Sequence, residues 1–292
     1  MTPKLAKEGI PCGLGSFAHR LCCSSLIPIY RDCAPRALTL DKILPAYVKI
    51  CWIHYTGKQR KIIKVEISLS LPCYNEEGNV RQVVGRACGV LDKIADKYEV
   101  IIVDDGSSDR TLEIARELTA QNPKIKFIHH EVNQGYGAAV RSGLKSSQYE
   151  YVAFTDGDGQ FDLGELKALI DLMPGNDMVI GYRSRRKDPF YRWLNSRLYG
   201  FLIRLLFGLE IQDLNCALKV FRKKVIDDIT IESNAALVNA EILLKAGKKG
   251  YRKIKEVPVS HYPRTAGKQT GADLRVILRT FGEIFQLWRK LR

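Results

Sequence analysis

The chain has 292 residues, enough for one large domain or two small ones. Its hydrophobic fraction of 46% and charged fraction of 27% are ordinary for a globular protein. No stretch reaches the roughly 18 apolar residues of a membrane-spanning helix, so we expect neither such a helix nor a signal peptide. None of the 8 cysteines forms a Cys-x-x-Cys pair, which argues against a zinc ribbon, and reduced cytosolic thiols are the default expectation.

The formal charge of +14 is distributed unevenly along the chain. Residues 61–182 carry a net charge of −6, whereas residues 183–292 carry +14. An acidic half that could hold a cation is thus followed by a basic half that could hold an anion. Nucleic acid, a membrane surface or a phosphorylated acceptor could each use the basic half.

Residues 1–61 show no sustained hydrophobic period, and prolines interrupt each candidate element. We expect a poorly ordered N-terminal extension there, of the kind that a start codon assigned too far upstream produces. The residues that follow, 62–271, are expected to form the main domain, and residues 272–292 a C-terminal amphipathic helix.

From residue 62 onward, strand patterns alternate with helix patterns. The strands are predicted at residues 67–71, where Pro72 stops the first one, 99–103, 126–130, 151–155 and 177–180. The helices between them are predicted at residues 79–97, 110–121, 137–146 and 162–172. This alternation predicts an α/β fold with a mostly parallel central sheet flanked by helices.

The last third of the chain has a different character. Helices are predicted at residues 188–207, 234–246 and 273–292, a turn into a strand at 213–222, and a strand at 251–257. The final helix has one apolar stripe and a basic opposite side, so it could lie on a membrane or pack on the sheet.

Three predicted strands end in polar clusters, at residues 74–77, 104–105 and 156–158. Ligands of parallel sheets bind at the carboxyl ends of the strands, so these clusters are expected to converge. Asp156 and Asp158 leave their strand on one side, about 6–7 Å apart at the backbone. Two hard oxygen ligands suit Mg²⁺ or Mn²⁺ held jointly with substrate phosphates. An isolated Asp-Gly-Asp would more often be a solvated turn, but the two other acidic strand ends favour the metal.

The order of these motifs resembles the inverting family 2 glycosyltransferases of GT-A fold. The motifs are residues 72–77 (PCYNEE), 103–109 (VDDGSSD), 133–137 (NQGYG) and 156–160 (DGDGQ). The continuation is similar to dolichol-phosphate mannose synthase and its polyprenyl-phosphate glycosyltransferase relatives. It includes residues 181–183 (GYR), 195–197 (NSR), 213–223 (DLNCALKVFRK), 256–259 (EVPV) and 264–268 (RTAGK). The resemblance covers about residues 65–292.

The resemblance implies a role for each matching position. The nucleotide sugar would be bound by Pro72, Tyr74, Glu76, Val103, Asp105, Asp156, Gly157, Asp158 and Arg183. The divalent ion would be held by Asp156, Asp158 and Gln160, and the acceptor phosphate by Arg183, Arg197, Arg264 and Lys268. The catalytic residues would be Asp158 and Asp213, the latter aligning the acceptor or an arginine. The sequence departs from the pattern of these relatives at two positions: Thr270 stands where they carry a lysine, and Cys216 where they often carry a glycine.

The resemblance implies transfer of a hexose, mannose or glucose, from a donor of the GDP-mannose or UDP-glucose type to polyprenyl or dolichyl phosphate. The protein would work at the cytosolic face of a membrane, peripherally bound, and a membrane-anchoring subunit could take part. Two alternatives stay open: a family 2 enzyme with a glycan, protein or soluble sugar as acceptor, and a noncatalytic binding module. No nucleic-acid recognition motif accompanies the basic charge, so nucleic acid is not the expected partner.

Overall fold

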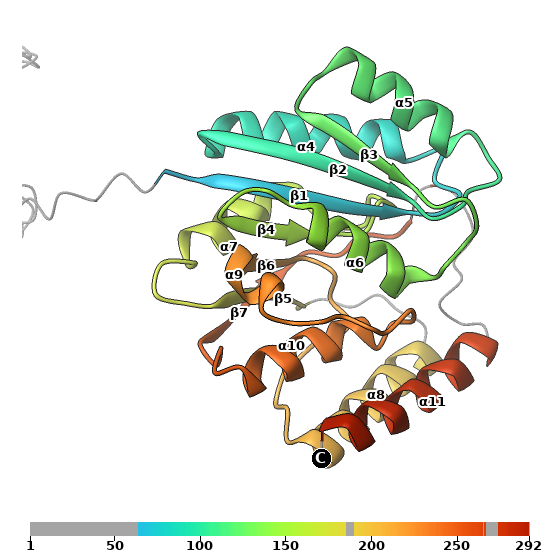
Figure 1. Ribbon diagram of the computed structural model, residues 1–292, viewed down its shortest axis with the longest axis vertical. Helices are drawn as coiled ribbons and strands as arrows, with labels where there is room; N and C mark the ends of the chain where they lie inside the picture. The colour runs from blue at the N-terminus through green and yellow to red at the C-terminus, as the bar shows by residue number, and fades with distance from the viewer. Residues whose placement is uncertain (1–63, 185–189, 265, 267–273, 292) are drawn as a thin grey trace, which may run out of the picture. The chain divides into compact units, whose positions relative to one another are not determined.

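The computed structural model describes residues 64–184, 190–264, 266 and 274–291, all within one unit, residues 64–292 (Figure 1). The extension expected at residues 1–61 lies outside the described residues. The domain boundaries expected at residues 61/62 and 271/272 stay predictions. In the described residues, seven strands form one sheet in the order β3-β2-β1-β4-β6-β5-β7. They are β1 (Glu66–Cys73), β2 (Lys97–Asp104), β3 (Ile125–His129), β4 (Tyr151–Phe154), β5 (Met178–Arg183), β6 (Lys219–Arg222) and β7 (Ile254–Val259).

The sheet is mostly parallel, as the alternation of strands and helices predicts. β1 pairs in parallel with both β2 and β4, and β5 pairs in parallel with β7. β6 runs antiparallel to its neighbours β4 and β5. The segment before β6 therefore begins at the same edge at which β4 and β5 end, which brings residues 213–218 beside the acidic motif.

Helices cover both faces of the sheet. Figure 1 shows α4 and α5 on one face and α6 and α10 on the other. The helices are α4 (Val80–Ile94), α5 (Thr111–Gln121), α6 (Tyr136–Ser146), η2 (Leu163–Glu165), α7 (Leu166–Asp171), α8 (Phe190–Phe207), α9 (Lys223–Asp227), α10 (Val238–Lys248) and α11 (Leu274–Leu291). The short α9 has no counterpart in the sequence prediction, and the predicted helix at 162–172 begins as the 3-10 turn η2.

The first strand runs further than the sequence predicts. β1 continues through Pro72 to Cys73, although Pro72 is expected to stop it. The pairing of β1 with β4 covers only Ile67 to Ser70, so no partner strand remains on that side when Pro72 is reached. The missing N–H of the proline thus costs no hydrogen bond of the ladder, and its carbonyl accepts from the backbone N–H of Gly157 at 3.2 Å.

The C-terminal helix packs against the body of the protein. Ile284 and Leu287 are 2% and 5% exposed and belong to the main hydrophobic core. Lys290 pairs with Glu232 at 2.8 Å, and the Ser233 hydroxyl donates to Glu283. These contacts show that the described part of α11 packs against the protein, and contact of its outer side with a membrane stays a prediction. None of the helices in the described part of the chain is long and apolar enough to cross a bilayer.

Candidate active site

The acidic motif lies directly after β4, at the carboxyl edge of the sheet. The backbone N–H of Thr155 donates to the carbonyl of Ser70, which continues the pairing of β4 with β1 beyond Phe154. A Cβ atom at Gly157 would lie 2.4 Å from the Cys73 sulfur, so only glycine fits at the centre of the motif. At Gly157, between the two aspartates, the loop therefore passes close to β1.

Burial governs the electrostatics of the two carboxylates. Burial and, after it, the charge of Asp158 raise the pKa of Asp156, Tyr136 and Lys219 lower it, and the result is a pKa of about 7. Burial likewise raises the pKa of Asp158, although the backbone N–H of Gln160 and the charge of Arg264 lower it. Two buried carboxylates that both ionise repel each other, so a bound cation would stabilise their charged forms.

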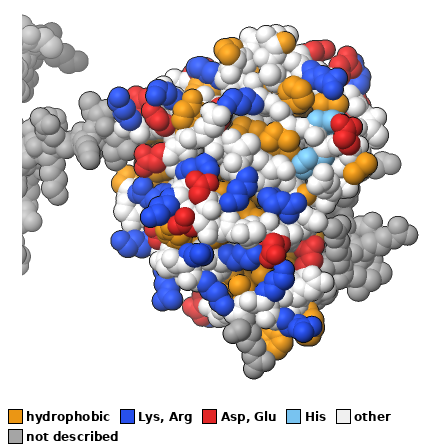
Figure 2. Space-filling model, in the orientation of Figure 1, with side chains coloured by type: hydrophobic (Ala, Val, Ile, Leu, Met, Phe, Trp, Pro, Cys, Tyr) orange, Lys and Arg blue, Asp and Glu red, His pale blue; other side chains and the backbone are white. Residues whose placement is uncertain are grey.

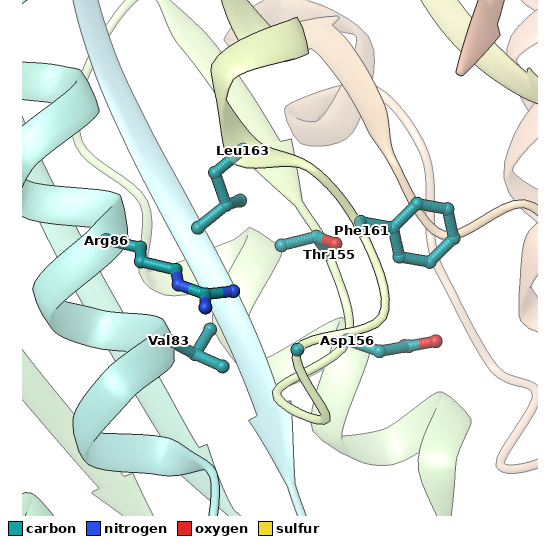
Figure 3. Close-up of a pocket in the computed structure, with 7 residues that line it drawn as sticks. Val83, Arg86, Thr155, Asp156, Phe161 and Leu163 are labelled. Atoms are coloured by element: carbon teal, nitrogen blue, oxygen red, sulfur yellow. The ribbon is translucent and has the colours of Figure 1, made fainter. Parts of the chain in front are cut away.

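One carboxylate oxygen of Asp156 lacks a hydrogen-bond partner. Oδ1 of Asp156 is buried and has no hydrogen-bond partner in the structure. Buried polar atoms are nearly always paired, so an atom of this kind points to a missing ligand. Figure 3 shows the carboxylate directed away from Arg86 and Val83, which approach the loop from α4. The cavity on that α4 side has a volume of about 10 Å³, room for one water molecule.

The metal-binding set can be compared with what a divalent ion requires. The described residues contain no group of three or more His, Cys, Asp or Glu side chains that could hold a metal. Mg²⁺, however, is commonly held by one or two carboxylates together with substrate phosphates and water. Asp156 and Asp158, with the buried, unpartnered Oδ1 of Asp156, fit that mode of binding. Gln160 lies in the same loop, where its side-chain amide donates to the carbonyl of Tyr262 at 2.8 Å.

Arg183 and Asp213 form a second part of the site. Arg183 ends β5, and its guanidinium donates two hydrogen bonds to the Asp213 carboxylate, at 2.7 and 2.9 Å. The backbone N–H of Arg183 also donates to Asp213, at 3.2 Å. Such a two-point pair fixes the plane of the guanidinium. The resemblance suggests that Asp213 aligns either the acceptor or an arginine, and the structure shows it bound to an arginine, Arg183.

Arg264 joins the late loop to the beginning of the sheet. Its guanidinium pairs with Glu76 at 2.5 Å and lies 3.8 Å from a carboxylate oxygen of Asp158. Asn79 donates to Glu76 at 2.7 Å and to the carbonyl of Ala266 at 3.2 Å. Loops far apart in the sequence therefore meet over the carboxyl ends of β1 and β4.

Asp105 is held within the protein. One oxygen contacts His130 at 2.7 Å and accepts from the N–H of Gln134 at 3.0 Å, and the other accepts from the N–H of Gly135 at 2.8 Å. His130 also contacts the Ser142 hydroxyl at 2.9 Å. In this arrangement Asp105 shapes the loop before α6, and its part in nucleotide binding stays a prediction.

The structure places the other sequence-predicted residues as follows. Pro72 and Val103 are buried in β1 and β2, whereas Tyr74 is 42% exposed at the end of β1. Arg197 is exposed on α8, and Lys268 lies outside the described residues. The site thus brings together residues from β1, β4, β5 and the loop after β7.

Sequence reasoning missed two side chains beside Asp156. Burial raises the pKa of Tyr136, and the charge of Asp156 raises it further, because the phenol faces that carboxylate. Lys219 is 1% exposed in β6, and its charge lowers the pKa of Asp156. Lys219 could have been noticed in the sequence, because it is the one charged residue in the otherwise apolar run 216–221.

The fold is that of the GT-A glycosyltransferases, and comparison with solved structures supports this. Glucosyl-3-phosphoglycerate synthase from Mycobacterium tuberculosis, in complex with uridine diphosphate, superposes with a TM-score of 0.57 at 18% identity, over 78% of this chain and 80% of that one. TarS 1–349 of S. aureus superposes with a TM-score of 0.51 at 19% identity, over 78% and 65% of the two chains.

The profile of glycosyl transferase family 2 matches residues 68–230, and the chain belongs to that family. It is 28% identical over 236 residues to a dodecaprenyl-phosphate galacturonate synthase of Rhizobium johnstonii, covering 79% of this chain and 68% of the relative. It is 30% identical over 214 residues to an undecaprenyl-phosphate 4-deoxy-4-formamido-L-arabinose transferase of Edwardsiella ictaluri, covering 72% and 64%. A glycosyltransferase AglD of Haloferax volcanii is 30% identical, and the match spans 38% of its length.

Proposed function

We propose that the protein transfers a hexose, mannose or glucose, from a nucleotide diphosphate sugar to polyprenyl or dolichyl phosphate, with inversion at the anomeric carbon. The observation that carries the proposal is the buried, unpartnered oxygen of Asp156 next to Asp158 at the carboxyl edge of the sheet. The relatives named for transfer to dodecaprenyl and undecaprenyl phosphate support the lipid acceptor.

The proposed cofactor is Mg²⁺ or Mn²⁺, held by Asp156, Asp158 and Gln160. When bound, it would supply positive charge to the diphosphate that leaves with the nucleotide. One solved structure of the Mycobacterium tuberculosis synthase contains Mn²⁺ together with uridine-diphosphate-glucose, at a TM-score of 0.57. In this chain itself, the metal site is supported by the burial of Asp156 and Asp158, which raises the pKa of both carboxyl groups.

The donor is proposed to lie over the carboxyl ends of β1, β2 and β4. Tyr74 is exposed there and offers a ring to the base, while Glu76 and Asp105 are buried and hold the surrounding loops. Pro72 and Val103 would form the floor of the nucleotide site, and Gly157 would admit the diphosphate beside the two aspartates.

Arginines are proposed to bind the phosphates. Arg183, fixed by Asp213, would face the donor diphosphate and the acceptor phosphate, and Arg264 would approach from the late loop. Arg197 and Lys268 would complete the acceptor side. A phosphate monoester is already anionic near neutral pH, so it can attack the anomeric carbon from the opposite face without a strong general base. The role left to Asp213 is to orient Arg183.

The membrane surface is the proposed location, with the cytosolic face as the side on which nucleotide sugars occur. Leu198, Phe201 and Leu205 share one face of α8 and are 55%, 64% and 68% exposed. Phe285 of α11, a helix drawn beside α8 in Figure 1, is 58% exposed. We propose that a lipid bilayer covers these four residues, called the apolar stripe below.

Positive charge is concentrated in the C-terminal part of the chain. Figure 2 shows more Lys and Arg than Asp and Glu side chains over the lower half of the visible face, where α10 and α11 lie. Residues 183–292 carry the net charge of +14. Anionic headgroups would be attracted to such a surface. A membrane-anchoring subunit could add to this attachment, and nucleic acid is not proposed as a partner.

A donor screen tests the proposed function. The purified full chain is incubated with radiolabelled GDP-mannose, UDP-glucose, a UDP-uronic acid or a UDP-pentose, with polyprenyl phosphate and with Mg²⁺ or Mn²⁺. We expect label to enter the organic phase only when polyprenyl phosphate is present. Label that stays in water on a glycan, protein or soluble sugar would instead establish the non-lipid acceptor, and no transfer from any donor would favour a noncatalytic module.

A further inference from the structure

A lysine lies in the interior of the sheet, where a charged side chain is costly. Lys219 is 1% exposed and stands in β6 between Phe154 of β4 and Ile180 of β5. Its ammonium lies 5.5 Å from the centre of the Phe154 ring. Burial lowers the pKa of Lys219 to about 8. Lysine is almost never fully buried unless its charge is satisfied, so its partners indicate its purpose.

The partners of Lys219 are oxygens of a single turn and one helix. Its ammonium donates to the carbonyl of Leu214 at 3.0 Å, to the carbonyl of Cys216, and to the side-chain oxygen of Asn239 at 2.8 Å. These contacts use the three donors of an ammonium group. None of the three acceptors is a carboxylate, although the charges of Asp213 and Asp156 also act on Lys219 and raise its pKa.

The turn that Lys219 holds is the one that carries Asp213. The backbone N–H of Cys216 donates to the carbonyl of Asp213 at 3.3 Å, which closes the turn. The carboxylate of Asp213 in turn fixes the guanidinium of Arg183 through two hydrogen bonds. The charges of Lys219 and Arg183 both lower the pKa of Asp156, so both groups lie within electrostatic reach of the acidic motif.

We propose that Lys219 is a positioning residue, which fixes the turn at residues 213–216 so that Asp213 holds Arg183 at the donor diphosphate. A neutral side chain of similar length would fill the same space without ordering the two carbonyls. The proposal rests on the proposed function for its kinetic consequence, whereas the geometry of the turn is independent of it.

The kinetic test compares Lys219 with a second lysine, Lys145, which also donates to backbone carbonyls but is more exposed. Lys145 of α6 donates to the carbonyls of Ile226 and Ile229, at 2.5 and 2.9 Å, so Lys145→Met removes a similar set of contacts away from the site. We expect Lys219→Met to lower kcat/KM for the donor by about 10- to 100-fold, through kcat and the donor KM, with the acceptor KM nearly unchanged. Lys145→Met should change the unfolding midpoint but none of these constants.

A double-mutant cycle separates positioning from general damage to the fold. If Lys219 acts through Asp213, the Lys219→Met and Asp213→Asn effects on kcat/KM will overlap, and the double variant will be little worse than Asp213→Asn alone. Lys219→Arg, which keeps the charge, should recover part of the activity. Multiplicative losses in the double variant, or kinetics of Lys219→Met equal to those of Lys145→Met, would overturn the proposal.

A spectroscopic measurement tests the geometry without any substrate. The Arg183 Nε–H signal in a proton–nitrogen NMR spectrum, assigned with Arg183→Lys, is expected to exchange slowly with water because Asp213 accepts from it. Lys219→Met should speed that exchange at least several-fold, while Lys145→Met leaves it as in the wild type. An unchanged exchange rate in Lys219→Met refutes the positioning role even if no donor is ever transferred. Failure of the wild-type donor screen would instead count against the proposed function alone.

Discussion

Arg264 and Glu76, which are 188 positions apart in the sequence, form a buried ion pair across the candidate site. Their side chains are 12% and 8% exposed, and burial raises the pKa of Glu76 while Asn79 and Arg264 lower it. Removing one member of such a pair leaves an uncompensated charge in a dry environment. The pair therefore ties the late loop to the segment between β1 and α4.

The first prediction concerns the stability of this link. Arg264→Ala should lower the free energy of unfolding by about 3 kcal/mol, because Glu76 is left buried and unpaired. The double variant with Glu76→Gln should recover part of that loss, because the unpaired charge is then gone. Urea unfolding followed by circular dichroism measures both values. A single variant as stable as the wild type would show that water replaces the arginine.

The second prediction concerns the acidic motif. Asp158→Ala should reduce sugar transfer by at least about 1000-fold, because one of two carboxylates proposed to hold the metal is lost. The unfolding midpoint should stay near the wild-type value or rise. Asp171→Ala, at an exposed carboxylate of α7 that pairs with Lys167 at 2.6 Å, provides the control and should keep full activity. Transfer near the wild-type rate in Asp158→Ala would refute the metal assignment.

The third prediction follows from the pKa of Asp156, which burial raises to about 7 from an ordinary value of 3.8. Between these two pH values the folded protein holds a proton that the unfolded chain has lost, so stability falls as pH rises. In the absence of divalent ions, Asp156→Asn should therefore match the wild type near pH 4 and exceed it at pH 8 by about 2–4 kcal/mol. Thermal unfolding in EDTA measures the difference.

Mn²⁺ gives the complementary arm of this experiment. Added at pH 8, it should raise the unfolding midpoint of the wild type and have little effect on Asp156→Asn, because ligands that bind the folded state stabilise it. An equal response of the two proteins would place the ion elsewhere. A pH-independent difference between them would show that Asp156 is already ionised in the folded protein at low pH.

The fourth prediction concerns the acceptor. Arg197→Ala should raise the KM for polyprenyl phosphate by about 10-fold or more while leaving the donor KM within about twofold, because a charged hydrogen bond contributes roughly 1.5–3 kcal/mol. Arg116→Ala, at an exposed position of α5, is the matched control. Initial rates at varied acceptor in detergent give both constants. An unchanged acceptor KM would remove Arg197 from this role.

The fifth prediction concerns the apolar stripe on α8 and α11. Leu205→Asp should weaken binding to vesicles of mixed neutral and anionic phospholipid by about 10-fold or more, because burying a leucine side chain contributes roughly 1.5–3 kcal/mol. Val132, which is also 68% exposed but lies before α6, gives the matched control Val132→Asp. Sedimentation with the vesicles measures both. Equal binding of the two variants would place the lipid contact elsewhere.

The order of strands and helices was predictable because hydrophobic periodicity and turn residues are local properties. Asp162, at the start of the helix predicted at residues 162–172, caps η2, since its side chain accepts from the N–H of Gly164 at 2.9 Å. The stop at Pro72 was wrong because only the partner strands decide whether a proline lacks a hydrogen bond. The prediction also missed α9, because a helix of five residues is too short to show a hydrophobic period.

The candidate site divides in the same way. Sequence alone determined the family resemblance and the pair Asp156 and Asp158, because closely spaced carboxylates after an apolar run carry their own signal. Only the tertiary structure joined Asp213 to Arg183, Glu76 to Arg264, and Lys219 to the turn at 213–216. These contacts arise because the antiparallel β6 and the late loop return to the edge at which β1, β4 and β5 end, and spacing along the chain does not encode that return.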